Sequence, residues 1–322
     1  MSAPVQPSPR RHDFGRGVSL AFAVTILGVA PLLVTGAPSA SARSAKPSVI
    51  NAIGAESEYA DVLSQIGGQY VQVSSILNNP NTDPHTYEAS PSVAQEVSHA
   101  ALIVQNGVGY DSFMDHMESA SPNPKRKVIV VQHVLGLPDG TPNPHLWYDP
   151  KTMPAVARVM AADLADVAPG HKAYFQTRLT VFDTSLQPLT RAIAAFKDQH
   201  AGTPVATTEP VADYLLSAMG LRNLTPFTFQ SDIMNGVDPA PQDITLENGF
   251  FTKHLVKVFC YNEQVVDSLT RTIRENAQGA HVPIVGVYET MPTPGYDYQS
   301  WMLAEVKAIR DGVLHGTSTS HL

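Results

Sequence analysis

The stretch SVINAIGAESEYADVLSQIGGQYVQVSSILNNPNTDPHTYE, residues 48–88, predicts the fold of the region that it opens. Its elements alternate as strand, helix and strand, at residues 48–55, 58–66 and 71–77. Short, continuous apolar strands separated by a helix are typical of a parallel sheet covered by helices on both faces. A polar loop follows the second strand and places His85 directly after Pro84. Because proline fixes its own φ angle, this loop is expected to hold the histidine in a set direction.

Beyond this stretch, the same alternation continues on both sides of a long helical region. Further strands are predicted at 101–105, 127–131, 204–207, 224–229, 256–261 and 283–288, with helices at 90–99, 111–118, 153–167, 210–219, 264–277 and 297–314, and a helix that begins at 241. Apolar residues at spacings of three and four predict one long amphipathic helix over 171–199, which Pro188 is expected to kink. The chain is therefore predicted to form an α/β lobe, a long helix and a second α/β lobe. A polar tail from His315 onwards is expected to be mobile.

The N-terminal residues have the composition of a secretory signal. Three arginines at positions 10, 11 and 16 precede an apolar run at 18–36, and Ala40-Ser41-Ala42 fits a signal-peptidase cleavage pattern. The apolar run is also long enough to span a membrane, so an uncleaved anchor is the alternative. The predicted division of the chain is a signal peptide at 1–42, an N-terminal lobe at 43–151, a helical linker at 152–200 and a C-terminal lobe at 201–322. An exported protein of the periplasm or the cell surface is expected.

Composition restricts the class of protein further. The formal net charge is −8, with 43% hydrophobic and 16% charged residues, which predicts a globular protein and disfavours nucleic acid as a partner. The single cysteine, Cys260, excludes an intrachain disulfide and a cysteine-rich zinc site, and it is expected to be a buried core residue. No cysteine lies near residue 42, so a lipid anchor on an N-terminal cysteine is not expected.

Four metal-competent side chains are predicted to lie at the carboxyl ends of strands, where open α/β sheets bind their ligands. They are His85, His145, Glu209 and Glu289. Two come from each lobe, so together they would place a divalent metal in the cleft between the lobes. Two imidazoles with two carboxylates can hold Zn²⁺, and carboxylates that bind through both oxygens would also suit Mn²⁺.

Each of these residues also has a simpler interpretation. A single loop histidine is more often a surface residue than a ligand, and Glu209, which precedes Pro210, could serve only as a negative charge at a helix N-terminus. Two other acids, Asp238 and Asp297, lie near the expected cleft and are alternatives to Glu289. The joint pattern of four candidates at strand ends, two in each lobe, favours the metal site.

Several motifs resemble, in order along the chain, the zinc- and manganese-type solute-binding proteins of bacterial ABC importers. In the N-terminal half they are Asp83-Pro84-His85-Thr86-Tyr87-Glu88, Asn106-Gly107-Val108-Gly109-Tyr110 and Asn143-Pro144-His145-Leu146-Trp147. In the C-terminal half they are Thr208-Glu209-Pro210, Tyr261-Asn262-Glu263-Gln264, Glu289-Thr290-Met291-Pro292 and Tyr298-Gln299-Ser300-Trp301-Met302. The resemblance covers about residues 48–314. It implies two Rossmann-like lobes joined by a rigid long helix, and metal capture between them for delivery to a membrane permease.

The resemblance assigns the four ligand positions of that family to His85, His145, Glu209 and Glu289. The third position is a histidine in many zinc-type members and a glutamate in many manganese-type members. The histidine-rich acidic loop of the zinc type is missing here, since residues 119–142 contain only His133. Zn²⁺ and Mn²⁺ therefore both stay open as the bound ion.

The function predicted from the sequence is that of a non-enzymatic receptor, expected to act as a monomer with a membrane ABC permease as its partner. A secreted metallohydrolase is the main alternative, and a surface adhesin that uses the same fold is another. The sequence contains neither an H-E-x-x-H motif nor a G-x-S-x-G motif, which disfavours the hydrolase. Four protein ligands would also close the site, whereas a catalytic zinc keeps one position for water.

Overall fold

Two four-stranded parallel sheets form the framework of the protein in the computed structural model, which describes residue 21 and residues 49–81, 83–292 and 295–322. Apart from residue 21, the predicted signal segment at 1–42 lies outside the described residues. The strand order is β2-β1-β3-β4 in the first sheet and β6-β5-β7-β8 in the second. Both sheets therefore follow the same topology, and the predicted fold of two α/β lobes is confirmed.

The N-terminal lobe is built on the first sheet. Its strands are β1 (Ile50–Glu56), β2 (Val71–Leu77), β3 (Leu102–Gln105) and β4 (Lys127–Val130), and its helices are α1 (Ser57–Gly67), α2 (Pro91–His99), α3 (Phe113–Ala120) and α4 (Val131–Val134), with the 3-10 turns η1 (Gly68–Tyr70) and η2 (Pro84–Thr86). β1 pairs in parallel with β2 through Ile50 and Val71 and with β3 through Ala52 and Leu102. Both β1 and β3 are almost entirely buried, as their continuous apolar sequences predict for a sheet covered on two faces.

The C-terminal lobe is built on the second sheet. Its strands are β5 (Pro204–Thr207), β6 (Arg222–Asn223), β7 (Phe259–Asn262) and β8 (Ile284–Val287), and its helices are α8 (Asp213–Ala218), α9 (Phe227–Met234), α10 (Pro241–Thr252), α11 (Ser268–Gly279) and α12 (Tyr298–His315). Cys260 lies in the middle of β7 and is fully buried, which confirms its predicted place in the core.

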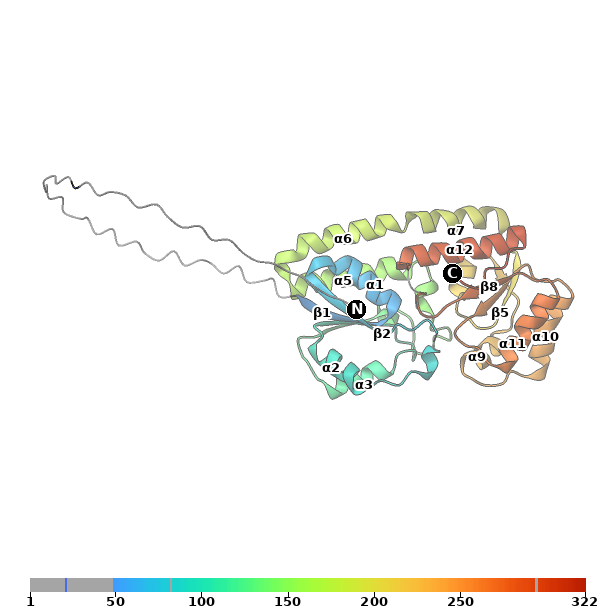
Figure 1. The fold of residues 1–322 in the computed structure, drawn as a ribbon, viewed down its shortest axis with the longest axis horizontal. Coiled ribbons are helices and arrows are strands. Elements are labelled where there is room, and N and C mark those ends of the chain that lie inside the picture. The colour runs from blue at the N-terminus through green and yellow to red at the C-terminus, as the bar shows by residue number, and fades with distance from the viewer. Residues whose placement is uncertain (1–20, 22–48, 82, 293–294) are drawn as a thin grey trace, which may run out of the picture. The chain divides into compact units, whose positions relative to one another are not determined.

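Helices connect the two lobes. They are η3 (Leu146–Tyr148), α5 (Thr152–Val167), η4 (Pro169–His171), α6 (Lys172–Ser185) and α7 (Gln187–His200). α6 packs against α1 and α5, whereas α7 packs against α12, and Figure 1 shows the two helices running one after the other alongside both lobes. The predicted kink appears as an interruption at Leu186, because Pro188 is the second residue of α7 and has no N–H to donate to the preceding turn.

One predicted strand, at residues 224–229, is wrong. The structure instead has the two-residue strand β6 and then the helix α9, which begins at Phe227 directly after Pro226. Pro226 has an extended backbone and starts the helix, and Phe229 becomes fully buried on the helix face. A few apolar residues in a short segment do not by themselves distinguish a strand from a buried helical turn, which explains the error.

The prediction of a mobile tail after His315 is also wrong. Thr319 forms a parallel bridge with Val285 of β8, donating its N–H to the Ile284 carbonyl and accepting from the Gly286 N–H, both over 2.8 Å. The tail thus covers the free edge of β8, which would otherwise expose unpaired backbone groups. Gly286 makes this approach possible, since a Cβ atom there would lie only 2.3 Å from the Ser320 carbonyl oxygen.

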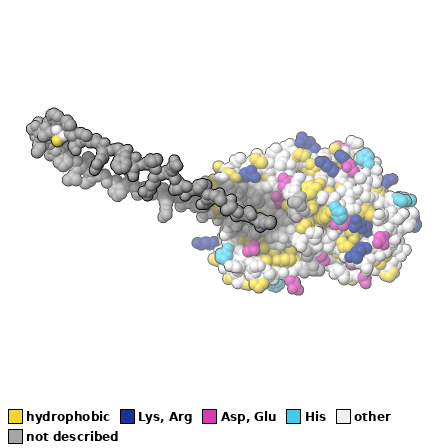
Figure 2. Space-filling model, in the orientation of Figure 1, with side chains coloured by type: hydrophobic (Ala, Val, Ile, Leu, Met, Phe, Trp, Pro, Cys, Tyr) yellow, Lys and Arg dark blue, Asp and Glu magenta, His cyan; other side chains and the backbone are white. Residues whose placement is uncertain are grey.

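The surface of the protein mixes charge types. Figure 2 shows acidic, basic and hydrophobic side chains interspersed over the visible face of the described residues. No helix in the described part of the chain is both long enough and apolar enough to cross a membrane.

Replacing Gly286 with alanine should displace the tail from β8, because the new methyl group would overlap with the Ser320 carbonyl. We expect a loss of about 1–3 kcal/mol in the free energy of unfolding, measured by denaturant titration. Gly279→Ala, at the end of α11 where a Cβ meets nothing within 4 Å, is the matched control and should be neutral or stabilising. Equal stability of the two variants would show that the tail does not hold this edge.

Candidate metal centre

Three of the four predicted ligands lie beyond the carboxyl ends of strands, and His145 lies in the segment between α4 and η3. His85 is the middle residue of η2, after β2, and its backbone N–H donates to the Asp83 carboxylate over 2.8 Å. His145 immediately precedes η3. Glu209 and Glu289 each lie two residues beyond a strand, β5 and β8 respectively. The carboxyl ends of strands are where open α/β sheets bind their ligands.

Two of the four side chains, those of His85 and His145, approach a single oxygen atom of a third, Glu289. Glu289 Oε2 lies 3.1 Å from His85 Nε2 and 3.2 Å from His145 Nε2. One ligand atom from each of these three residues lies within 4.8 Å of the others. His145 and Glu289 are fully buried, while the His85 side chain is 22% exposed, so His85 forms the solvent side of the group.

The ring of His145 is oriented by a neighbouring amide. Its Nδ1 lies 2.8 Å from Asn143 Oδ1, and the Asn143 amino group donates over 2.7 Å to the Pro210 carbonyl of the other lobe. Since the amide oxygen only accepts, Nδ1 carries a proton, and Nε2, 3.2 Å from Glu289 Oε2, is the ring atom available to a metal. Burial lowers the pKa of His145 from its ordinary value, which eases the loss of the Nε2 proton when a metal binds. A neutral imidazole held by its second nitrogen is the usual form of a metal-binding histidine.

Glu209 lies beside these three residues but outside the close group. It is fully buried, and its Oε1 accepts a hydrogen bond of 3.1 Å from the Asn262 amino group, which also donates to Glu289 Oε1 over 2.7 Å. Its Oε2 has no hydrogen-bond partner among the described residues. Burial, and after it the charge of Glu289, raises the pKa of Glu209 well above its ordinary value. A cation would satisfy this buried oxygen and stabilise the ionised form.

The electrostatics of the group centre on Glu289. Burial would raise the pKa of Glu289, but hydrogen bonds and charges from His145 and His85 outweigh burial and hold it below its usual range. For His85 the effects are reversed. Burial lowers its pKa, but the Glu289 and Asp83 carboxylates outweigh burial and raise the pKa overall. Glu289 is therefore a carboxylate at neutral pH, and a cation bound by all three residues would take over the charge compensation that the two histidine contacts supply.

The two alternative acids do not belong to this site. Asp297 is the N-cap of α12, where it accepts the Ser300 N–H over 2.9 Å as half of a capping box. Asp238 is exposed in the segment between α9 and α10. Neither replaces Glu289, because Asp297 is engaged at a helix start and Asp238 is exposed to solvent.

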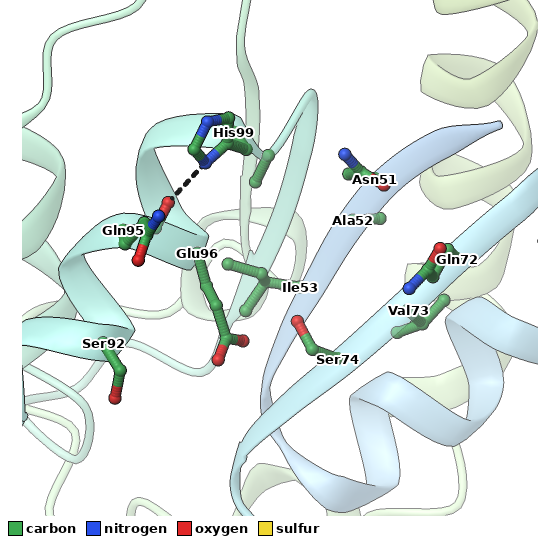
Figure 3. Close-up of a pocket in the computed structure, with 11 residues that line it drawn as sticks. Asn51, Ala52, Ile53, Gln72, Val73, Ser74, Ser92, Gln95, Glu96 and His99 are labelled. Carbon is green, nitrogen blue, oxygen red and sulfur yellow. Dashed lines mark hydrogen bonds between the residues drawn. The ribbon is translucent and has the colours of Figure 1, made fainter. Parts of the chain in front are cut away.

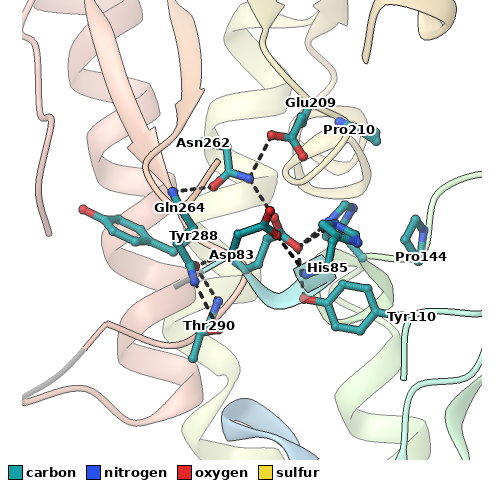
Figure 4. A network of polar contacts seen from close by, with 12 residues as sticks. Asp83, His85, Tyr110, Pro144, Glu209, Pro210, Asn262, Gln264, Tyr288 and Thr290 are labelled. Atoms are coloured by element: carbon teal, nitrogen blue, oxygen red, sulfur yellow. Dashed lines mark hydrogen bonds and ion pairs between the residues drawn. The ribbon is translucent and has the colours of Figure 1, made fainter. Parts of the chain in front are cut away.

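Three further residues complete the site, and the sequence alone assigned them no role of their own. Tyr110 donates a 3.0 Å hydrogen bond to Glu289 Oε2, Asn262 bridges the two glutamates, and Gln264 Oε1 accepts the backbone N–H of Glu289 over 2.6 Å. Figure 4 shows Tyr110, Asn262 and Gln264 gathered around the centre. The sequence could have pointed to them only through their positions near the carboxyl ends of strands. Tyr110 follows β3, Asn262 ends β7 and Gln264 lies just beyond β7.

The loop that carries Tyr110 is strained. Val108 has φ of 56°, between Gly107 and Gly109, which also have positive φ. A β-branched residue rarely adopts this conformation, so the surrounding contacts must hold it there. The Asp111 carboxylate accepts the N–H groups of Asn106 and Gly107, and Gln132 Oε1 accepts the Val108 N–H over 2.7 Å. Asn106 also donates to the Pro144 carbonyl, next to His145, over 2.8 Å.

The buried acid Glu305 is linked through Tyr148 to the loop that carries Glu289. Tyr148 OH donates to the Tyr288 carbonyl over 2.8 Å and lies 3.3 Å from Glu305 Oε1, which accepts from Trp301 Nε1 over 3.2 Å. Burial raises the pKa of Glu305 to about 8, despite the opposing hydrogen bonds from Trp301 and Tyr148. Glu305 is therefore a neutral acid at neutral pH, and its proton lies in the core of the protein.

A surface cavity of about 530 Å³ lies elsewhere in the N-terminal lobe, between α2 and the β1–β2 side of the sheet (Figure 3). Its titratable lining residues are Glu96 and His99, and His99 Nδ1 is engaged by the Gln95 carbonyl over 2.8 Å. None of the four candidate ligands lines it. The cavity and the candidate metal centre are therefore separate features.

The fold and this centre define a class of two-lobed α/β proteins with candidate metal ligands between the lobes. A family model described as "Zinc-uptake complex component A periplasmic" matches residues 55–312, so the chain belongs to that family.

Individual relatives agree with this assignment. The chain is 25% identical over 167 residues to manganese-binding lipoprotein MntA of Bacillus subtilis, covering 50% of this chain and 54% of that protein. It is 22% identical to manganese ABC transporter substrate-binding lipoprotein PsaA of Streptococcus mitis, covering 80% and 86%. The chain spans about half the length of the first curated relatives it matches. The solved structure of the periplasmic zinc-binding protein TroA of Treponema pallidum aligns with a TM-score of 0.67 at 17% identity, covering 84% of this chain and 99% of that one.

The neutral state of Glu305 predicts a specific pH dependence of stability. The folded protein keeps this proton up to about pH 8, whereas the unfolded chain releases it near pH 4.5, the ordinary value for a glutamate. Raising the pH between these values therefore destabilises the folded state. Glu305→Gln keeps the acceptor for Trp301 but cannot ionise, so it should make the fall in unfolding free energy shallower by about 1.4 kcal/mol per pH unit.

The measurement is denaturant unfolding of the metal-stripped protein between about pH 5.5 and 7.5. Glu275→Gln, at an exposed position of α11, is the control and should leave the slope unchanged. A Glu305→Gln slope identical to that of the unmodified protein would mean that Glu305 is not protonated in the fold.

Proposed function

We propose that this protein captures a divalent transition metal, Zn²⁺ or Mn²⁺, outside the cytoplasm and delivers it to an ABC permease for import. The observation that carries the proposal is the convergence of His85, His145 and Glu289, with Glu209 beside them. Imidazole nitrogens and carboxylate oxygens are the donors that both ions accept. The names of the relatives support the cargo, since MntA and PsaA are described as manganese proteins and TroA as a zinc protein.

The arrangement favours capture over catalysis. A catalytic zinc keeps an open coordination position for water or substrate and needs a general base nearby. Here the two histidines and two glutamates would fill four positions, and Tyr110 and Asn262 are occupied in holding Glu289. We therefore propose a binding protein in preference to a secreted metallohydrolase. The adhesin alternative has no support from a particular surface of the described residues.

Export and partnership form the second part of the proposal. The signal-like segment at 1–42 and the periplasmic description of the family support a protein that acts outside the cytoplasm. The name of PsaA, a substrate-binding component of an ABC transporter, supports a membrane permease as the partner. We propose that the receptor is a monomer, which sedimentation of the metal-loaded protein would test. Two relatives are lipoproteins by name, whereas the cysteine of this chain, Cys260, is buried in β7.

The proposal is tested by metal titration of residues 43–322 after stripping with a chelator. We expect Zn²⁺ and Mn²⁺ to bind more tightly than about 1 μM in competition with a chromogenic chelator. His85→Ala and Glu289→Ala each remove a converging donor and should weaken binding at least about a hundredfold. His116→Ala, at an exposed position of α3, is the control and should not change the affinity.

Two outcomes would contradict the proposal. If neither ion binds the unmodified protein more tightly than micromolar, the receptor function is wrong. If the metal-loaded protein hydrolyses peptide or phosphate esters with turnover that His85→Ala abolishes, the metallohydrolase becomes the better account.

A further inference from the structure

Asn262 connects the two glutamates of the centre. It is the last residue of β7 and is completely buried. Its Nδ2 donates to Glu289 Oε1 over 2.7 Å and to Glu209 Oε1 over 3.1 Å, and Figure 4 shows its side chain extending towards Glu209. A carboxamide nitrogen carries two hydrogens, so one N–H serves each carboxylate.

The orientation of this amide is fixed. Asn262 Oδ1 accepts the backbone N–H of Gln264 over 3.0 Å, and the Asn262 backbone N–H donates to Thr208 Oγ1 over 2.9 Å. An amide flipped by 180° would place its NH₂ group against the Gln264 N–H and its oxygen against two carboxylates. Both changes are unfavourable, so the NH₂ group must face Glu209 and Glu289.

The Asn262 amide makes the two oxygens of each carboxylate different, because it binds one of them and not the other. Oε1 of Glu289 and Oε1 of Glu209 are both tied to Asn262. The remaining oxygens differ from them, since Glu289 Oε2 faces both imidazoles and Glu209 Oε2 is buried without a partner among the described residues. Each glutamate therefore has one oxygen that is not held by Asn262. Binding through both oxygens would have to turn Oε1 towards the metal and weaken its buried hydrogen bond to the amide.

We propose that Asn262 determines the metal selectivity of the centre by restricting Glu209 and Glu289 to one metal-binding oxygen each. Two imidazole nitrogens and two carboxylate oxygens then make a four-coordinate site, which suits Zn²⁺. Mn²⁺ favours more oxygen donors, and this restriction removes them. The inference rests on the proposed metal-binding function and adds that the centre discriminates against Mn²⁺ more strongly than its donor types alone require.

The test compares the ratio of the Mn²⁺ and Zn²⁺ dissociation constants between variants. The ratio is the informative quantity, because Zn²⁺ binds more tightly than Mn²⁺ at almost any site with nitrogen and oxygen ligands. Asn262→Ala frees both Oε1 atoms and should lower the ratio at least about tenfold, mainly through tighter Mn²⁺ binding, because each carboxylate can then bind through both oxygens. Asn262→Leu fills nearly the same volume without an N–H group and should lower the ratio in the same direction.

Gln230→Ala is the matched control in the same lobe. Gln230 is also a buried amide, and its Nε2 donates to Thr207 Oγ1 over 2.7 Å and to Asp213 Oδ2 over 2.9 Å. Neither of these partners is a candidate ligand, so the loss of the Gln230 amide should destabilise the lobe and leave the ratio unchanged.

X-ray absorption of the unmodified protein loaded with Zn²⁺ provides a readout that needs no variant, and we expect four nitrogen and oxygen neighbours. The inference is overturned if that count is five or six, or if both Asn262 variants keep the ratio within about twofold of the unmodified protein. A failure of the proposed function looks different, because then neither ion would bind the unmodified protein at all.

Discussion

The Glu289 carboxylate is a negative charge buried between the two lobes, and the rest of the site is arranged to accommodate it. A carboxylate removed from water is strongly unfavourable unless charges or hydrogen bonds compensate it. His85, His145 and Tyr110 approach its Oε2 from the N-terminal lobe, and Asn262 holds its Oε1 from the C-terminal lobe. A divalent cation would supply the same compensation more strongly. The need to neutralise this carboxylate therefore explains why both lobes close on one point.

Helices and hydrogen bonds between the lobes position them around the Glu289 carboxylate. α6 and α7 extend along both lobes, and hydrogen bonds join one lobe to the other close to the proposed ligands. Asn143 donates to the Pro210 carbonyl, Tyr298 OH donates to the Trp147 carbonyl over 2.8 Å, and the Met291 N–H donates to Ser57 Oγ over 3.0 Å. Each of these contacts lies within a few residues of a proposed ligand or in the loop that follows it. Such support reduces the reorganisation that metal binding requires.

Much of this arrangement could be predicted from sequence, because short apolar strands and their carboxyl ends are local features. His85, His145 and Glu289 were identified from their positions after predicted strands, and the structure brings their donor atoms together. The predicted strand at 224–229 was wrong because a short segment with only three large apolar residues fits a buried helical turn equally well. Asn262 could not be assigned a role, since its function depends on two carboxylates 53 and 27 residues away along the chain.

The central claim is that His85, His145, Glu209 and Glu289 enclose one metal ion between the lobes. Anomalous diffraction from crystals of the Zn²⁺-loaded protein tests it most directly, because the signal locates the metal without assuming its ligands. The account predicts a single strong peak within about 2.0–2.2 Å of one nitrogen from each histidine and one oxygen from each glutamate. A peak that lies elsewhere, or one that has the two histidines but neither glutamate as neighbours, would contradict it.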